Sequence, residues 1–335
     1  MNKTLLRSLL LGACCAAPIA AVAGGVEVAP CCQPPRVDIP DMRAGWGFYL
    51  EGAAIQAYNN NLSYGFVEIV PAVIPTVVGE FKIPNVTPKW NFAIRGGVDY
   101  TLADSANVLK LDYEHVFDSN ATDNTEIDVL GFVHGGEVKI KLDGVRLVSE
   151  QHILIGPYWE ATLTGGLRYA HVQQTYERAI ASGVFGDDDD LEGSATFFGD
   201  SHEVKFNGVG PLGGFGGMFH LTENLALGGE TQIALLLGRN TNSIGLEYAV
   251  DGVVISEGGV DVSETTSLVP ELFARIYGNY FYRFTDGMEL QVELGWRLNQ
   301  FFNVRDAIAN DFFDVTHVSD DIGFSGPYLS AHLKI

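Results

Sequence analysis

Apolar and polar residues alternate with a period of two along much of this 335-residue chain. The clearest example runs from Met288 to Leu298, where even-numbered residues are apolar and odd-numbered residues are polar or glycine. A β-strand separates two such sets onto opposite faces, whereas a helix would spread both around its circumference. The alternation therefore predicts strands that have one apolar and one polar face.

The same alternation recurs along the chain and predicts ten strands. They cover residues 46–58, 89–101, 107–117, 136–150, 157–177, 204–221, 225–238, 267–284, 288–301 and 324–335. The phase of the alternation changes near Asp143–Gly144, which predicts a bulge there. Residues 64–82, which Pro71 and Pro75 interrupt, leave open an additional hairpin and hence twelve strands.

Two features favour a membrane barrel over a soluble β-sandwich, which also alternates. Aromatic residues lie near the strand ends, as in the interfacial girdles of outer-membrane barrels. They are Trp46, Phe48, Tyr100, Trp159, Tyr280, Tyr282, Phe284 and Trp296. Short turns also alternate with long polar connections near residues 59–88, 118–135, 178–203, 239–266 and 302–322. The predicted fold is all-β: an antiparallel transmembrane β-barrel over residues 45–335, with short periplasmic turns and long extracellular loops.

The N-terminus has the pattern of a cleaved signal peptide over residues 1–23. Lys3 and Arg7 precede an apolar stretch, and Ala21–Ala23 forms a small-residue cleavage site. A membrane anchor and a lipoprotein signal ending at Cys14 are the alternatives. Residues 24–44 then form a linker that contains Pro and Cys, including the adjacent Cys31 and Cys32. Neighbouring cysteines bridge each other only in a strained ring, so either they are unpaired or linked to small thiols, or they form disulfides between chains.

The charge of the chain is strongly acidic, with 20 Lys+Arg against 42 Asp+Glu and a net charge of −22. Removal of residues 1–23 takes away two positive charges and no acid, which leaves −24. Such a chain repels phosphate, so nucleic acid is excluded as a partner. The content of 47% hydrophobic residues also argues against intrinsic disorder.

Three motifs resemble the Legionella-type major outer membrane protein family. They are Trp46–Glu51 in the first strand, Gly165–Ala170 in the middle of the chain, and Phe206–Gly213 in the strand that follows. The resemblance covers most of the chain from Trp46 onward, and it implies an outer-membrane pore that is sometimes oligomeric. The chain departs from the usual barrel ending, because its last residue, Ile335, is not aromatic.

The polar strand faces are expected to line the lumen of the barrel. The candidate lumen-lining residues are Arg95, Asp99, Lys110, Asp112, Glu114, Glu160, Arg168, Glu230, Glu271, Arg275, Arg283, Glu289, Glu293 and Arg297. Either these charges pair across the strands and plug a narrow interior, or they line an aqueous path. In the second case their acid excess favours cations.

The predicted function is that of a porin-like protein in the outer membrane of a Gram-negative cell, which lets small hydrophilic solutes or ions diffuse with a weak cation preference. The alternative is a closed surface barrel that acts as an adhesin or structural protein. An enzyme is not favoured, because the chain has neither a Gly-x-Ser-x-Gly elbow nor a His-x-x-x-His pair, and no cofactor is expected. His115 and His171 are predicted on the outward face.

The expected partners are outer-membrane lipid and lipopolysaccharide, and a homo-oligomer is left open. Acidic loop segments such as Asp187–Asp190 suggest loose binding of divalent cations beside anionic lipopolysaccharide.

Overall fold

The computed structural model describes residues 37–38, 44–59, 88–103, 105–127, 132–183, 195–250, 253–285, 287–311 and 314–335. This part of the chain is all-β. Its strands are β1 (Val37–Asp38), β2 (Gly45–Asn59), β3 (Trp90–Thr101), β4 (Asn107–Ile127), β5 (Phe132–Ile155), β6 (Trp159–Gly183), β7 (Ala195–His220), β8 (Leu225–Val250), β9 (Val253–Arg283), β10 (Glu289–Asp311) and β11 (Asp314–Lys334).

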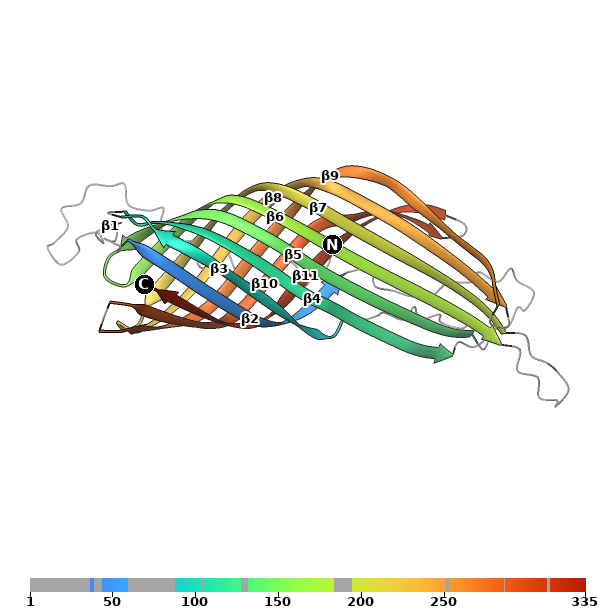
Figure 1. The fold of residues 1–335 in the computed structure, drawn as a ribbon, viewed down its shortest axis with the longest axis horizontal. Helices are drawn as coiled ribbons and strands as arrows, with labels where there is room; N and C mark the ends of the chain where they lie inside the picture. The colour runs from blue at the N-terminus through green and yellow to red at the C-terminus, as the bar shows by residue number, and fades with distance from the viewer. Residues whose placement is uncertain are drawn as a thin grey trace, which may run out of the picture. The chain divides into compact units, whose positions relative to one another are not determined.

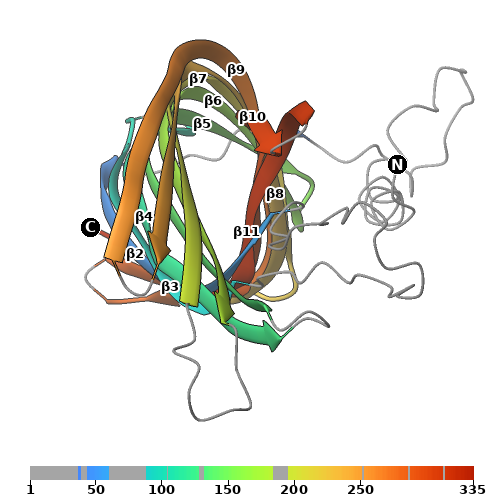
Figure 2. The ribbon, with the colours of Figure 1, turned by 90° about the vertical axis from the view of Figure 1, so that its right-hand side faces the viewer.

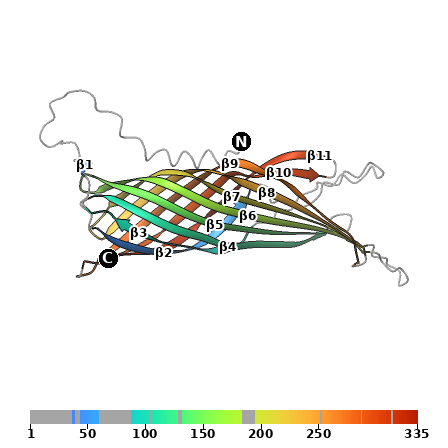
Figure 3. The same cartoon turned by 45° about the horizontal axis from the view of Figure 1, so that its top comes forward.

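Strands β2 to β11 form a closed antiparallel barrel of ten strands, as the sequence predicts. Strands that are consecutive in the chain pair with each other, β11 pairs with β2, and β5 with β6. The strands enclose a common interior (Figure 2) and are tilted in the barrel wall (Figure 3). The two-residue strand β1, which the sequence assigned to the linker, pairs with the end of β5.

Short turns gather at the end of the barrel where β2 begins and the chain ends (Figure 1). The amide of Ile335 donates to the carbonyl of Trp46 at 2.9 Å there. Gly156 and Gly287 adopt positive φ angles of 66° and 90° in two of these turns, which glycine tolerates without strain. Outer-membrane barrels place short turns in the periplasm, so this is the end that the sequence analysis predicts to be periplasmic, and it is called the periplasmic end below.

The strands are longer at the other end than the sequence predicts. Only residues 128–131 separate β4 from β5, only residues 251–252 separate β8 from β9, and only residues 312–313 separate β10 from β11. Most of the predicted long loops at 118–135, 239–266 and 302–322, and part of that at 178–203, therefore continue the ladders. The hydropathy signal missed them because it depends on one apolar face. Residues 1–23, Cys31, Cys32, the candidate hairpin at 64–82 and Asp187–Asp190 lie outside the described residues.

An apolar band covers the outside of the barrel. Large exposed side chains include Leu50, Leu167, Phe215 and Leu294, each more than half exposed. Aromatic rings pack at the periplasmic edge of the band, where Trp46 lies 5.0 Å from Tyr100 between ring centroids. In the described part of the chain, no helix is long and apolar enough to span a membrane.

The bulge predicted near Asp143–Gly144 is wrong. Strands β5 and β6 pair without interruption past these residues. The two register shifts of the β4–β5 ladder lie between Val116 and Ser119 and between Asn124 and Glu126. The even-numbered residues of β5 from Val138 to Glu150 are all buried, Leu142 and Arg146 among them. The phase change in hydropathy instead marks the level at which apolar residues move from the outer face to the inner face.

Candidate functional site

The interior of the barrel contains two layers of buried side chains. A charged layer lies toward the periplasmic end, and an apolar layer lies toward the end with the longer strands. On β2, for example, Glu51 is 3% exposed and Ile55, four residues further from the periplasm, is 1% exposed. The same order holds on β6, where Arg168 precedes Val172, and on β10, where Arg297 precedes Phe301. Period-two alternation places all of these residues on inner faces.

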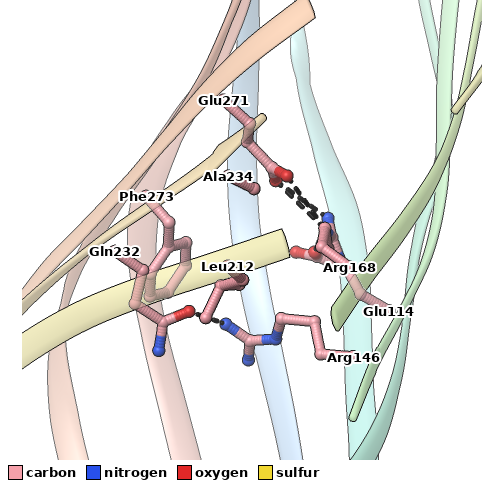
Figure 4. Close-up of a pocket in the computed structure, with 8 residues that line it drawn as sticks. All are labelled: Glu114, Arg146, Arg168, Leu212, Gln232, Ala234, Glu271 and Phe273. Carbon is pink, nitrogen blue, oxygen red and sulfur yellow. Dashed lines mark hydrogen bonds and ion pairs between the residues drawn. The ribbon is translucent and has the colours of Figure 1, made fainter. Parts of the chain in front are cut away.

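Arg168 of β6 is a central residue of the charged layer and is 1% exposed. Its Nε donates to Glu271 Oε2 at 3.0 Å, and its Nη2 donates to Glu271 Oε1 at 3.0 Å and to Glu114 Oε2 at 3.3 Å (Figure 4). Glu271 is on β9 and Glu114 on β4, neither of which neighbours β6 in the sheet. These ion pairs therefore cross the interior of the barrel.

Arg297 extends the network to the opposite wall. Its Nη1 lies 2.5 Å from Glu51 Oε1 and 3.0 Å from Glu114 Oε1. Glu114 thus accepts a hydrogen bond from Arg168 with one oxygen and forms an ion pair with Arg297 through the other. One carboxylate joins side chains that come from β6 and β10.

Asp112 holds a second pair of arginines. Its Oδ1 lies 3.0 Å from Arg95 Nε and 3.0 Å from Arg146 Nε. The guanidinium of Arg146 also donates to Gln232 Oε1 at 2.9 Å and lies over the Phe273 ring, 5.1 Å from its centroid. Stacking and hydrogen bonding together fix the orientation of this cation.

Arg275 forms the third part of the layer. Its Nε lies 2.6 Å from Glu230 Oε2 and its Nη1 lies 2.8 Å from Glu293 Oε1. The Tyr328 hydroxyl also donates to Glu293 Oε1, at 2.5 Å. The buried carboxylate of Glu293 therefore accepts hydrogen bonds from both the Arg275 guanidinium and the Tyr328 phenol.

A cavity of about 10 Å³ lies within the charged layer. Its walls include Arg146, Arg168, Glu114 and Glu271 together with Leu212 and Phe273 (Figure 4). This volume fits about one water molecule. Arg146 Nη2 and Arg168 Nη1 are buried and make no hydrogen bond to the described residues, so this part of the layer has unused donors.

The apolar layer fills the interior beyond the charges. Its largest fully buried members include Phe206, Phe301, Phe324, Ile140, Leu142 and Leu236. Phe301 and Phe324 pack edge to face with their ring centroids 6.4 Å apart. Buried Asn240 lies among them and donates to the Val304 carbonyl at 2.5 Å. Sequence reasoning missed this layer, because it assigned apolar residues to the lipid face alone.

Imidazole–carboxylate pairs lie at the periplasmic end of the interior. His152 Nδ1 is 2.6 Å from Glu160 Oε1, and His220 Nε2 is 3.4 Å from Glu160 Oε2. His332 Nε2 is 2.8 Å from Asp99 Oδ2. Among the described side chains no cluster has the arrangement of a metal site.

The structure brings most of the candidate lumen-lining residues into these contacts. Lys110 pairs with Glu150 at 2.6 Å. Arg283 and Glu289 differ from the rest, because they pair with each other at 3.0 Å beside a turn and the Arg283 side chain is 75% exposed. Sequence reasoning missed Glu51, Arg146, Glu150 and Gln232, which are buried in the interior. Their inward positions in the alternation were a usable signal, but the supposed bulge hid Arg146 and Glu150.

Comparison with known proteins decides the family. A family model described as the Legionella pneumophila major outer membrane protein precursor matches residues 38–335. The chain belongs to this family. The resemblance drawn from the three sequence motifs is therefore confirmed, and the family together with the barrel fold places the protein in the outer membrane. No curated protein matches the chain.

Several solved outer-membrane proteins match this chain in structural comparison. The outer membrane protease OmpT from Escherichia coli is 12% identical, with a TM-score of 0.43, 88% of this chain covered and 98% of that chain covered. A Pseudomonas aeruginosa FadL homologue is 8% identical, with a TM-score of 0.27 and coverages of 87% and 90%. A TodX mutant, described as a monoaromatic hydrocarbon channel, is 6% identical, with a TM-score of 0.30 and coverages of 88% and 91%. At these scores the similarities support no inference about the activity of this chain.

Proposed function

We propose that this outer-membrane barrel is a pore for small ions, weakly selective for cations, and that the conformation described here is its closed state. The observation that carries the proposal is the charged layer, in which ion pairs join strands on different walls of the barrel. A barrel that needed only structural filling would bury fewer charges, because removing an ion from water costs several kcal/mol. No covalent chemistry or cofactor is needed for this function.

The charged layer supplies the selectivity in this proposal. It combines six carboxylates, of Glu51, Asp112, Glu114, Glu230, Glu271 and Glu293, with five guanidinium groups, of Arg95, Arg146, Arg168, Arg275 and Arg297. The formal charge of the layer is therefore −1. Rings of charged side chains select ions by sign, so an open path through this layer favours cations.

The apolar layer supplies the gate. Side chains such as Phe206 and Leu236 fill the interior and offer an ion no replacement for its hydration shell. An apolar constriction stops ions even before it closes sterically, because water leaves it. Opening requires these side chains to move apart or turn aside.

Planar-bilayer recording of the folded protein tests the proposal. We expect rare, small conductance steps from the unaltered protein and larger, more frequent steps from Phe206→Ala combined with Leu236→Ala. Glu293→Gln in that background removes one negative charge from the layer. It is expected to shift the reversal potential, measured in a salt gradient, toward the equilibrium potential of the anion. If the variant Phe206→Ala/Leu236→Ala is folded but gives no conductance steps, the proposal that the barrel is a pore is refuted.

A closed structural or adhesive barrel is the second candidate. It is favoured by the near-complete burial of Arg168 and Arg297, which are 1% and 2% exposed. In that case the two layers are a permanent filling, and neither the unaltered protein nor the gate variant conducts.

A further inference from the structure

The outward face of strands β5 to β8 changes character just beyond the apolar band. On these four strands the last exposed apolar residues of the band are Val145, Tyr169, Val209 and Leu237. The next outward residues are Asp143, His171, Asn207 and Arg239. These four are neighbours in the ladder, because Asp143 pairs with His171, His171 with Asn207, and Asn207 with Arg239. A continuous polar row therefore follows the apolar band.

Side chains in this row are held by hydrogen bonds. His171 Nδ1 lies 2.7 Å from Asn207 Oδ1, and the Tyr169 hydroxyl donates to the same oxygen at 3.3 Å. Asp143 Oδ1 accepts from the Tyr113 hydroxyl at 2.6 Å. Arg239 is 77% exposed and pairs loosely with Glu264 at 3.4 Å. The row thus combines hydrogen-bonded polar groups with a largely exposed cation at one end.

A second row lies one step further from the periplasm. Lys141 pairs with Gln173, and Gln173 pairs with Lys205. Glu203 Oε2 accepts from Lys205 Nζ at 2.7 Å, and its Oε1 accepts from Gln173 Nε2 at 2.6 Å. The Lys205 side chain is 40% exposed. We call Lys141, His171, Gln173, Lys205, Asn207 and Arg239 the outward polar patch.

We propose that the outward polar patch binds the phosphorylated saccharide headgroup of a lipid in the outer leaflet. The position of the patch supports this, because a lipid that covers the apolar band with its chains brings its headgroup to the next outward residues. The charge supports it as well: Lys141, Lys205 and Arg239 share this outward surface of a chain whose net charge is −22. The carboxylates beside them, of Asp143, Glu203 and Glu264, are each engaged by a hydrogen bond or an ion pair. The saccharide part of the headgroup is matched by the side-chain amides of Asn207 and Gln173, which can donate hydrogen bonds to sugar hydroxyls and accept hydrogen bonds from them. The ring of Tyr169 lies beside these amides.

The acidic neighbours do not prevent phosphate binding. The pairs Lys205–Glu203 and Arg239–Glu264 are partly or largely exposed, and exposed pairs contribute little free energy. Lys205 or Arg239 can therefore leave its carboxylate partner and bind a phosphate at little cost in free energy.

Lipid binding by the folded barrel in neutral detergent tests this proposal, and the result does not depend on whether the barrel conducts. The probes are diphosphoryl lipid A, the same lipid after enzymatic removal of its phosphates, and phosphatidylglycerol, each followed by native mass spectrometry. We expect the triple variant K141Q/K205Q/R239Q to bind diphosphoryl lipid A about tenfold more weakly than the unaltered protein. The loss is expected to be much smaller for the dephosphorylated lipid and for phosphatidylglycerol.

The control variant is Lys89→Gln, which makes the same charge change at an exposed lysine beside β3, away from the patch. It is expected to bind lipid A as the unaltered protein does. Equal binding by the triple variant and the unaltered protein would overturn the proposal. An equal loss for phosphatidylglycerol would also overturn it, because the patch would then attract any anionic lipid. If the triple variant folds poorly, the single variant R239Q gives the same test. Its affinity for diphosphoryl lipid A is expected to fall about twofold.

Discussion

Removing Arg168 is expected to destabilise the barrel strongly, because two buried carboxylates depend on this cation. Glu271 makes its ion pair with Arg168 through two guanidinium nitrogens, and Glu114 is paired with Arg168 and Arg297. In Arg168→Met the apolar side chain fills much of the same space, while Glu271 is left charged in the interior. Breaking a buried pair in this way costs about 3–5 kcal/mol in the free energy of unfolding.

A second substitution separates this electrostatic cause from a packing defect. Glu271→Gln in the Arg168→Met background removes the stranded charge, so we expect the double variant to recover about 2 kcal/mol of the loss. The coupling between the two sites in a double-mutant cycle is then well above the roughly 0.5 kcal/mol expected of independent sites. Arg283→Met is the matched control, since it breaks an ion pair whose arginine is 75% exposed, and it should cost less than about 1 kcal/mol.

The assay is reversible unfolding in urea of the barrel folded into lipid vesicles, followed by tryptophan fluorescence. Retention of a heat-modifiable folded band on gels confirms that each variant has folded before it is measured. Strictly additive losses at Arg168 and Glu271 would refute the reasoning. So would a loss below about 1 kcal/mol for Arg168→Met, because the charged layer would then be solvated.

Two further substitutions test the packing of the barrel. A Cβ at Gly144 would overlap the Arg168 guanidinium, so Gly144→Ala is expected to cost about 1–3 kcal/mol in urea unfolding, whereas Gly165→Ala, where a Cβ meets nothing within 4 Å, should be close to neutral. Equal effects at the two glycines would contradict the interior placement of Arg168. Leu167→Arg puts a charge into the apolar band, where Leu167 is 54% exposed, and should cost about 2–4 kcal/mol. Thr241→Arg, beyond the band, should cost about 0–1 kcal/mol, and similar costs at both sites would mean that the band is misplaced.

The sequence predicts the fold well because a barrel records its architecture in local alternation. Ten segments with period-two hydropathy correspond to the ten strands that close the barrel. The outward positions predicted for His115 and His171 agree with the hydrogen bonds that each makes to a residue on the outer face of the next strand. Strand length was predicted less well, since the ladders continue past the lipid where neither face needs to be apolar.

The partners of each charge could not be predicted from the sequence. Arg168 and Glu271 are 103 residues apart in the chain, and Arg297 and Glu51 are 246 apart. Their contacts depend on closure of the sheet and on the register of every strand between them. A shift of one residue in any ladder would turn one of these side chains out of the barrel.

The sequence by itself determined that the chain is a series of two-faced strands, because side chains of a strand alternate at every residue. It left undecided which face is apolar at each level. Only the tertiary structure showed that Leu147 of β5 faces lipid whereas Leu142 of the same strand lies in the apolar layer inside. The physical reason is that the solvent of the outer face changes from hydrocarbon to water along each strand, while closure of the barrel keeps the inner face away from water at both levels.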